Sequence, residues 1–153
     1  MRGSSRGIEP PYTVLAVDDD ESIRSLLVHY LEEQVEGFVV DTASNGRAAL
    51  ETLRGDDVDV DAVLLDISMP EMDGFETLDR IQEEGHDVVV IVLSGRDGEE
   101  EQLQAFDLGA LDFVKKPFSP EVLTARLKLN LAREAELRQS WPERSDVPTE
   151  VGE

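Results

Sequence analysis

The sequence predicts a three-layer α/β sandwich of the (βα)5 type, with a doubly wound sheet of five parallel strands. Short apolar runs alternate five times with segments of helical spacing, which is the order of parallel strands joined by right-handed crossovers. Two of the runs, Ala62–Leu65 and Val88–Leu93, are almost continuously apolar, as in strands buried on both faces of a sheet. The length of 153 residues is that of one domain.

The first half of the chain predicts two strand–helix units. The strand Tyr12–Val17 precedes a helix that begins near Glu21, whose apolar stripe consists of Ile23, Leu26, Leu27, Tyr30 and Leu31. The β-branched run Phe38–Thr42 predicts the second strand. The pair Ser44-Asn45 then caps a second helix, which runs to about Arg54.

The second half continues the same alternation. In chain order its elements are strand Ala62–Leu65, helix Gly74–Glu83, strand Val88–Leu93, helix Glu99–Leu108 and strand Asp112–Val114. Glycines follow both helices, at Gly85 and Gly109, as is common at helix ends. Ser119 and Pro120 provide a cap and a first-turn proline for a last helix, from Glu121 to about Arg138.

The pattern divides the chain into a disordered segment over 1–11, one domain over 12–138, and a flexible tail or the start of a linker over 139–153. The chain is therefore either a stand-alone domain or a piece of a longer protein. It contains no cysteine, which excludes thiol chemistry and disulfides. It also lacks an apolar run long enough to cross a membrane, so we expect a cytoplasmic protein.

The charge is strongly acidic, with 35 Asp and Glu against 14 Lys and Arg and a formal net charge of -21. Such a surface repels phosphates, so direct nucleic-acid binding by this segment is not expected. Self-repulsion that keeps the protein soluble is one explanation. The few lysines, which are Lys115, Lys116 and Lys128, favour a second one, adaptation to high salt, as in a halophilic archaeon.

Polar residues follow four of the predicted strands. They are Asp18-Asp19-Asp20, Asp66, Ser94 and the pair Lys115-Lys116. Parallel strands end at one edge of the sheet, where ligands bind in such folds. Clustered carboxylates suit Mg²⁺, and a lysine with a hydroxyl suits phosphoryl oxygens. An aspartate in this setting can act as a nucleophile and form an aspartyl phosphate.

Four stretches resemble, in order, the receiver domains of two-component response regulators: VLAVDDDESIR, VLLDISMPEMDGFE, VLSGRD and GALDFVKKPF. The resemblance extends from Tyr12 to Arg138, and it is specific because Asp66–Gly74 and Lys116–Phe118 both match. It implies a flavodoxin-like sheet with strand order 2-1-3-4-5. It further implies a partner, either a sensor histidine kinase or a phosphotransfer protein, that supplies the phosphoryl group.

The resemblance also implies roles for single residues. Asp66 matches the phosphate acceptor, and Lys116, before a cis proline, matches the lysine that pairs with a phosphoryl oxygen. Ser94 matches the hydroxyl that follows the phosphoryl group, and Phe113 matches the aromatic switch residue. Their motion would repack the face of the fourth helix, fifth strand and fifth helix, where a partner or a second copy could bind. Lys115 would point the other way, toward solvent.

The metal site that the resemblance implies holds Mg²⁺ through Asp18, Asp19, Asp66 and the backbone carbonyl of Ser68. Asp19 is the expected direct ligand, and Asp18 is expected to act largely through water. An acidic run after a strand can also be a plain solvated loop or a helix cap, which is the alternative interpretation of residues 18–20.

Two other functions stay open at this point. A pseudo-receiver would use the same fold as an interaction module without phosphorylation, but it normally lacks one of the functional residues. A phosphohydrolase of similar topology would carry a second aspartate two residues after the nucleophile, where this chain has Ser68. A receiver is not an enzyme in this sense, because it catalyses only its own phosphorylation and slow dephosphorylation. The phosphate lifetime, which side chains at Ser68 and Arg96 would influence, and the downstream output are not predicted.

Overall fold

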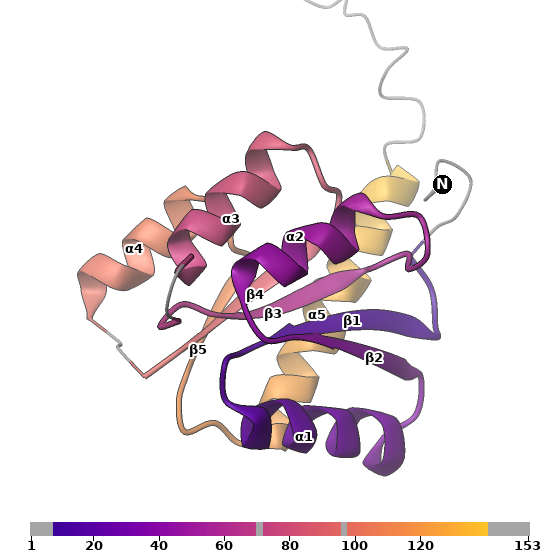
Figure 1. Cartoon of the computed structure of the whole chain (residues 1–153). Helices are drawn as coiled ribbons and strands as arrows, with labels where there is room; N and C mark the ends of the chain where they lie inside the picture. The colour runs from indigo at the N-terminus through magenta and orange to yellow at the C-terminus, as the bar shows by residue number, and fades with distance from the viewer. Residues whose placement is uncertain (1–7, 70–71, 96–97, 141–153) are drawn as a thin grey trace, which may run out of the picture.

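The computed structural model describes residues 8–69, 72–95 and 98–140, with the side chains of 139 and 140 left out. Five parallel strands form one sheet in the order β2-β1-β3-β4-β5, which confirms the predicted fold class and strand order (Figure 1). The strands are β1 Tyr12–Val17, β2 Phe38–Ala43, β3 Ala62–Asp66, β4 Val89–Ser94 and β5 Asp112–Lys115. The helices are α1 Glu21–His29, α2 Gly46–Arg54, α3 Gly74–Glu83, α4 Glu99–Asp107 and α5 Pro120–Ser140.

Helices cover both faces of the sheet, with α2, α3 and α4 on one side and α1 and α5 on the other (Figure 1). Successive side chains of a strand point to opposite faces, so each buried strand supplies both layers. In β1, for example, Leu15 and Val17 belong to the cluster that contains Leu50 of α2. Val14 and Ala16 belong to the cluster on the opposite face, under α1 and α5. The continuous burial of the central strands follows from this double coverage.

The strand register brings the polar residues of the sequence to one edge. Asp66, the last residue of β3, pairs with Leu93 of β4, and Ser94 pairs with Lys115 of β5. Asp18 directly follows β1, and its backbone N–H donates to the carbonyl of Ala43 at the end of β2. The carboxyl ends of all five strands therefore meet at this edge, as expected for parallel strands.

Side-chain caps begin four of the helices, and at α5 the Ser119 Oγ accepts from the backbone N–H of Val122, as predicted. The side chains of Asp20, Asn45 and Asp73 accept hydrogen bonds from backbone N–H groups in the first turns of α1, α2 and α3. The first residue of α3, Gly74, lies unusually close to β3: a Cβ there would be 2.3 Å from the Cα of Ile67 and 2.5 Å from the carbonyl oxygen of Asp66. Glycine at this position lets α3 start directly against the strand that carries Asp66.

The structure also differs from the sequence prediction in several places. The helix α1 ends in a π-helical turn over Tyr30–Gln34, which hydrophobic periodicity does not reveal. In the segment 1–11, for which disorder was expected, the structure describes residues 8–11, and Ile8 is buried among the core residues under α1 and α5.

No helix in the described parts of the chain combines the length and the apolar character that a bilayer span requires. Pro70, Glu71, Arg96 and the tail from residue 141 onward lie outside the described residues.

Candidate functional site

Asp18, Asp66 and Lys116 meet at the carboxyl edge of the sheet. Asp18 follows β1, Asp66 ends β3, and Lys116 follows β5. The Lys116 Nζ lies 2.8 Å from Asp18 Oδ2 and 3.4 Å from Asp66 Oδ1. Both carboxylates are almost completely buried, with Asp18 1% and Asp66 2% exposed. Three strands that are far apart in the sequence thus place two acids around one ammonium group.

The carboxyl group of Asp66 is destabilised in its charged form. Burial raises its pKa from 3.8 to about 6, and the negative charge of Asp18 acts in the same direction. The backbone N–H of Ser68 donates to Asp66 Oδ1 at 3.2 Å and, together with Lys116, partly offsets this increase. The site therefore holds excess negative charge that a bound cation would relieve.

The ammonium group of Lys116 is held in its charged form. Burial lowers its pKa, but Asp18 and Asp66 outweigh this effect, so the pKa lies above the ordinary value of 10.5. The peptide bond between Lys116 and Pro117 is cis, as predicted. The neighbouring Lys115 is exposed, and this agrees with the prediction that adjacent strand residues face opposite ways.

A third acid completes a candidate metal centre. Carboxylate oxygens of Asp18, Asp19 and Asp66 lie within 4.8 Å of one another. Asp19 is exposed, whereas Asp18 is already bonded to Lys116 and accepts from the backbone N–H of Asp20 at 3.0 Å. This arrangement is compatible with the expectation that Asp19 binds a cation directly. All donors are hard oxygen atoms, the type that Mg²⁺ prefers.

The acidic loop is fixed by a residue to which the sequence analysis gave no role. The Arg24 Nη1 donates to the backbone carbonyl of Asp18 at 2.7 Å. Asp20 caps α1 by accepting from the backbone N–H of Ser22 at 2.9 Å, so it acts as a helix cap, one of the two roles considered for the acidic run. The signal for Arg24 was its position one turn into α1, within reach of the loop that precedes the helix.

The residues predicted to form the switch lie on β4, the neighbour of the strand that carries Asp66, and on β5, the next strand in the sheet. Ser94 ends β4 and is fully buried, and its carbonyl oxygen accepts from the backbone N–H of Lys116 at 2.7 Å. Phe113 of β5 is partly buried and packs against the cluster under α2, α3 and α4. Ser68 lies two residues beyond Asp66. The structure thus brings the other predicted site residues to the same end of the sheet, and Phe113 lies two residues before the end of β5.

Sequence comparison identifies known proteins that resemble this chain. The profile of the family described as "Response regulator receiver domain" matches residues 14–128. The response regulator MprA of Mycolicibacterium vanbaalenii is 38% identical over 123 residues, which are 80% of this chain and 52% of that protein. MprA of Mycobacterium leprae is 38% identical over 120 residues, or 51% of its length. The chain therefore spans about half the length of the curated relatives that it matches.

Solved structures show the same fold. Chemotaxis protein CheY4 of Vibrio cholerae has a TM-score of 0.70 and 32% sequence identity, over 76% of this chain and 96% of that one. The structure of the CheX-CheY-BeF3-Mg+2 complex from Borrelia burgdorferi matches with a TM-score of 0.70 and 32% identity, over 76% of this chain and 86% of that one.

Proposed function

Because this chain belongs to the response regulator receiver domain family, we propose that Asp66 is the residue that receives its phosphoryl group. Receivers are signalling domains of two-component systems, and phosphorylation is the function expected of the family. The observation that supports Asp66 most strongly is the sharing of the Lys116 ammonium between Asp66 and Asp18. In that position a carboxylate nucleophile and a phosphoryl-binding cation lie side by side.

The proposed reaction follows from these contacts. A carboxylate oxygen of Asp66 attacks the phosphorus of a phosphohistidine on the donor protein, an O–P bond forms, and the N–P bond breaks with the imidazole as leaving group. The reaction converts the Asp66 carboxylate into an acyl phosphate, whose phosphoryl group carries more negative charge than the carboxylate. Lys116 already contacts Asp66 and has its charged form stabilised, so it is positioned to bind one of the new oxygens.

We assign Asp18, Asp19, Asp66 and the Ser68 carbonyl to a Mg²⁺ site. The residues fit a divalent cation because carboxylate oxygens of three aspartates lie within 4.8 Å of one another, with the Lys116 ammonium group in contact with two of them. In addition, burial and the charge of Asp18 raise the pKa of Asp66 to about 6. When bound, the ion supplies positive charge that lets phosphoryl oxygens approach the carboxylates. The related Borrelia burgdorferi CheY complex contains BeF3 and Mg²⁺.

We further propose that Ser94 and Phe113 convert the new charge into a change of surface. The Ser94 hydroxyl would move toward the phosphoryl group, and Phe113 would move inward into the space that Ser94 leaves. This motion repacks the face of α4, β5 and α5, where an output partner or a second copy would bind. The phosphoryl group shifts an equilibrium between two packings of one fold.

The proposed partners are a sensor histidine kinase or a phosphotransfer protein in the cytoplasm. The output comes either from contacts of this domain with other proteins or from a further part of a longer protein. The chain is not a turnover enzyme in this proposal, and Asp66 loses its phosphate by slow hydrolysis. Ser68 stands where a phosphohydrolase would carry its second aspartate, and its backbone N–H is bonded to Asp66. This position therefore offers no second carboxylate to act as a general acid.

Labelling with a small phosphodonor tests the proposal. Wild-type protein incubated with acetyl phosphate and Mg²⁺ is expected to gain an acid-stable, base-labile phosphoryl group, and EDTA is expected to prevent it. Asp66→Asn is expected to stay unlabelled, whereas the exposed-residue control Asp79→Asn is expected to be labelled like wild type. Undiminished labelling of Asp66→Asn would refute the assignment of Asp66. A wild-type protein that is never labelled would instead favour a phosphorylation-independent interaction module.

A further inference from the structure

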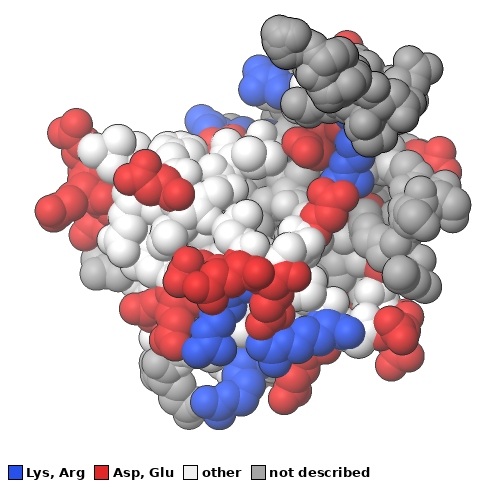
Figure 2. All heavy atoms as spheres, turned by 90° about the horizontal axis from the view of Figure 1, so that it is seen from above, with Lys and Arg blue, Asp and Glu red and all other residues white. Residues whose placement is uncertain are grey.

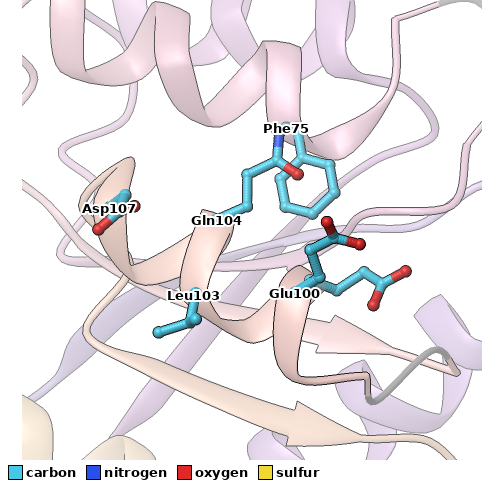
Figure 3. A pocket seen from close by; sticks show the side chains of 6 residues that line it. Phe75, Glu100, Leu103, Gln104 and Asp107 are labelled. Carbon is cyan, nitrogen blue, oxygen red and sulfur yellow. The ribbon is translucent and has the colours of Figure 1, made fainter.

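A hollow of about 390 Å³ lies between α3 and α4, and none of the residues assigned to the phosphorylation site lines it (Figure 3). Its six lining residues are Phe75, Glu100, Glu101, Leu103, Gln104 and Asp107. Phe75 comes from the first turn of α3, and the other five come from α4. In Figure 3 the Gln104 side chain extends from α4 toward the ring of Phe75. We call this surface the α3–α4 groove.

The sequence of α4 explains why this side of the helix is open. Glu100, Leu103, Gln104 and Asp107 occupy positions i, i+3, i+4 and i+7, which form one stripe of a helix. Three of these four residues are polar, as on the solvent-exposed side of a helix. Here the only residue within α4 that is buried is Ala105, on a different side, and Leu103 is 55% exposed. The stripe is therefore not part of the core of this domain.

The acids of the groove are not all explained by helix stability. Glu100 and Glu101 lie in the first turn of α4, where negative charge is favourable. Asp107, however, is the last residue of α4, where negative charge is unfavourable. No lysine or arginine occurs among the six lining residues. In the space-filling view, the left edge of the molecule, where Figure 1 places α4, likewise shows acidic and no basic side chains (Figure 2).

We infer that the α3–α4 groove is a docking surface for a cationic amphipathic helix of a partner protein. An apolar side chain of that helix contacts Phe75 and Leu103, and arginine or lysine residues on both sides of it pair with Glu100 and Asp107. These two acids are seven residues apart on α4, or about 10 Å, which is two turns on a bound helix as well. The aromatic face of Phe75 offers an arginine a further contact. The apolar residues Phe75 and Leu103 form the floor of the groove, and its acidic residues form the rim. Together they favour a helix that is both apolar and positively charged.

The groove differs from the face of α4, β5 and α5. Phe106 and Leu111, which are 44% and 46% exposed, do not line it. Its walls instead are the two helices that follow the site: α3 begins after the loop that leaves Asp66, and α4 begins after the loop that leaves Ser94. Binding to the groove does not depend on phosphorylation of Asp66, so the proposed function and this inference can fail separately.

Peptide titration of the unphosphorylated protein tests the inference. The probe is a synthetic helical peptide with leucines on one face and arginines beside them. The control peptide has the same sequence with glutamate in place of each arginine. Fluorescence anisotropy measures the affinity, and ¹⁵N chemical shifts locate the bound peptide. We expect saturable binding of the arginine peptide alone, with the largest shifts at Phe75 and over residues 100–107. Absence of saturable binding, or shifts centred on another surface, would overturn the inference.

A pair of triple variants separates the groove from the general acidity of the surface. The first variant, Glu100→Gln/Glu101→Gln/Asp107→Asn, removes the rim charges and is expected to weaken binding by about tenfold or more. The control, Glu36→Gln/Glu51→Gln/Asp57→Asn, removes the same charge from exposed positions outside the groove and is expected to bind almost like wild type. Leu103→Ser, which keeps every charge, is also expected to weaken binding. Equal losses in the two triple variants would contradict a specific groove.

Discussion

Replacing Asp66 with asparagine is expected to stabilise the unphosphorylated protein at neutral pH in the absence of Mg²⁺. The side chain is buried beside Asp18, and the pKa of its carboxyl is raised from 3.8 to about 6. A folded-state pKa above the unfolded value means that the folded protein holds the proton more tightly. Stability is therefore lost as the pH rises from about 4 through about 6, and the full penalty is present at pH 7 and above.

The size of this penalty follows from the two pKa values. A rise from 3.8 to about 6 corresponds to roughly 3 kcal/mol at neutral pH. Asparagine has nearly the same shape and removes the charge, so Asp66→Asn is expected to raise the free energy of unfolding by up to about 3 kcal/mol at pH 7.5. Near pH 4 the wild-type carboxyl is protonated in the folded state, and the difference is expected to become small.

Urea denaturation followed by far-UV circular dichroism measures this difference. Wild type, Asp66→Asn and the exposed control Asp79→Asn are compared with EDTA at several pH values. Addition of Mg²⁺ is expected to stabilise wild type more than Asp66→Asn, because the variant lacks one of the proposed ligands. A variant that is less stable than wild type at pH 7.5, or a gain that does not depend on pH, would refute the account of the Asp66 environment.

Three further predictions concern other parts of the molecule. Lys116→Met is expected to slow labelling by acetyl phosphate roughly a hundredfold, whereas Lys115→Met, at an exposed neighbour, is expected to leave the rate nearly unchanged; equal rates would contradict the assigned role. Gly74→Ala is expected to lower the free energy of unfolding by about 3 kcal/mol, because the added Cβ would overlap the backbone at the end of β3. The control is Gly95→Ala, where the added Cβ meets open space and the free energy of unfolding is expected to stay nearly unchanged. Raising NaCl into the molar range is expected to increase the melting temperature, since salt screens the net charge of -21; a decrease would argue against charge repulsion as a limit on stability.

The fold and the core of the site were predictable because each depends on backbone order. Alternating strands and helices predict a parallel sheet. The carboxyl ends of parallel strands share one edge, so Asp18, Asp66 and Lys116 come together there whatever the conformation of the loops. The cap at Asn45 was predictable because it is a local interaction, between residues three apart.

Other features depend on contacts that a linear pattern does not contain. The π-helical turn after α1 begins where the apolar stripe ends, at Tyr30 and Leu31, so periodicity did not reveal it. The bond from Arg24 to the Asp18 carbonyl depends on how α1 leaves the acidic loop. The open stripe of α4 was hidden because Leu103 fits a core position in the sequence, and only the packing shows that α3 does not cover it.

Chemical trapping of the phosphorylated residue tests the central claim most directly. Borohydride reduction converts an aspartyl phosphate to homoserine, and tandem mass spectrometry of the digested protein then locates the modified residue. After treatment with acetyl phosphate and Mg²⁺, the account predicts homoserine at position 66 and aspartate unchanged at positions 18 and 19. Homoserine at 18 or 19 with position 66 unmodified would contradict it.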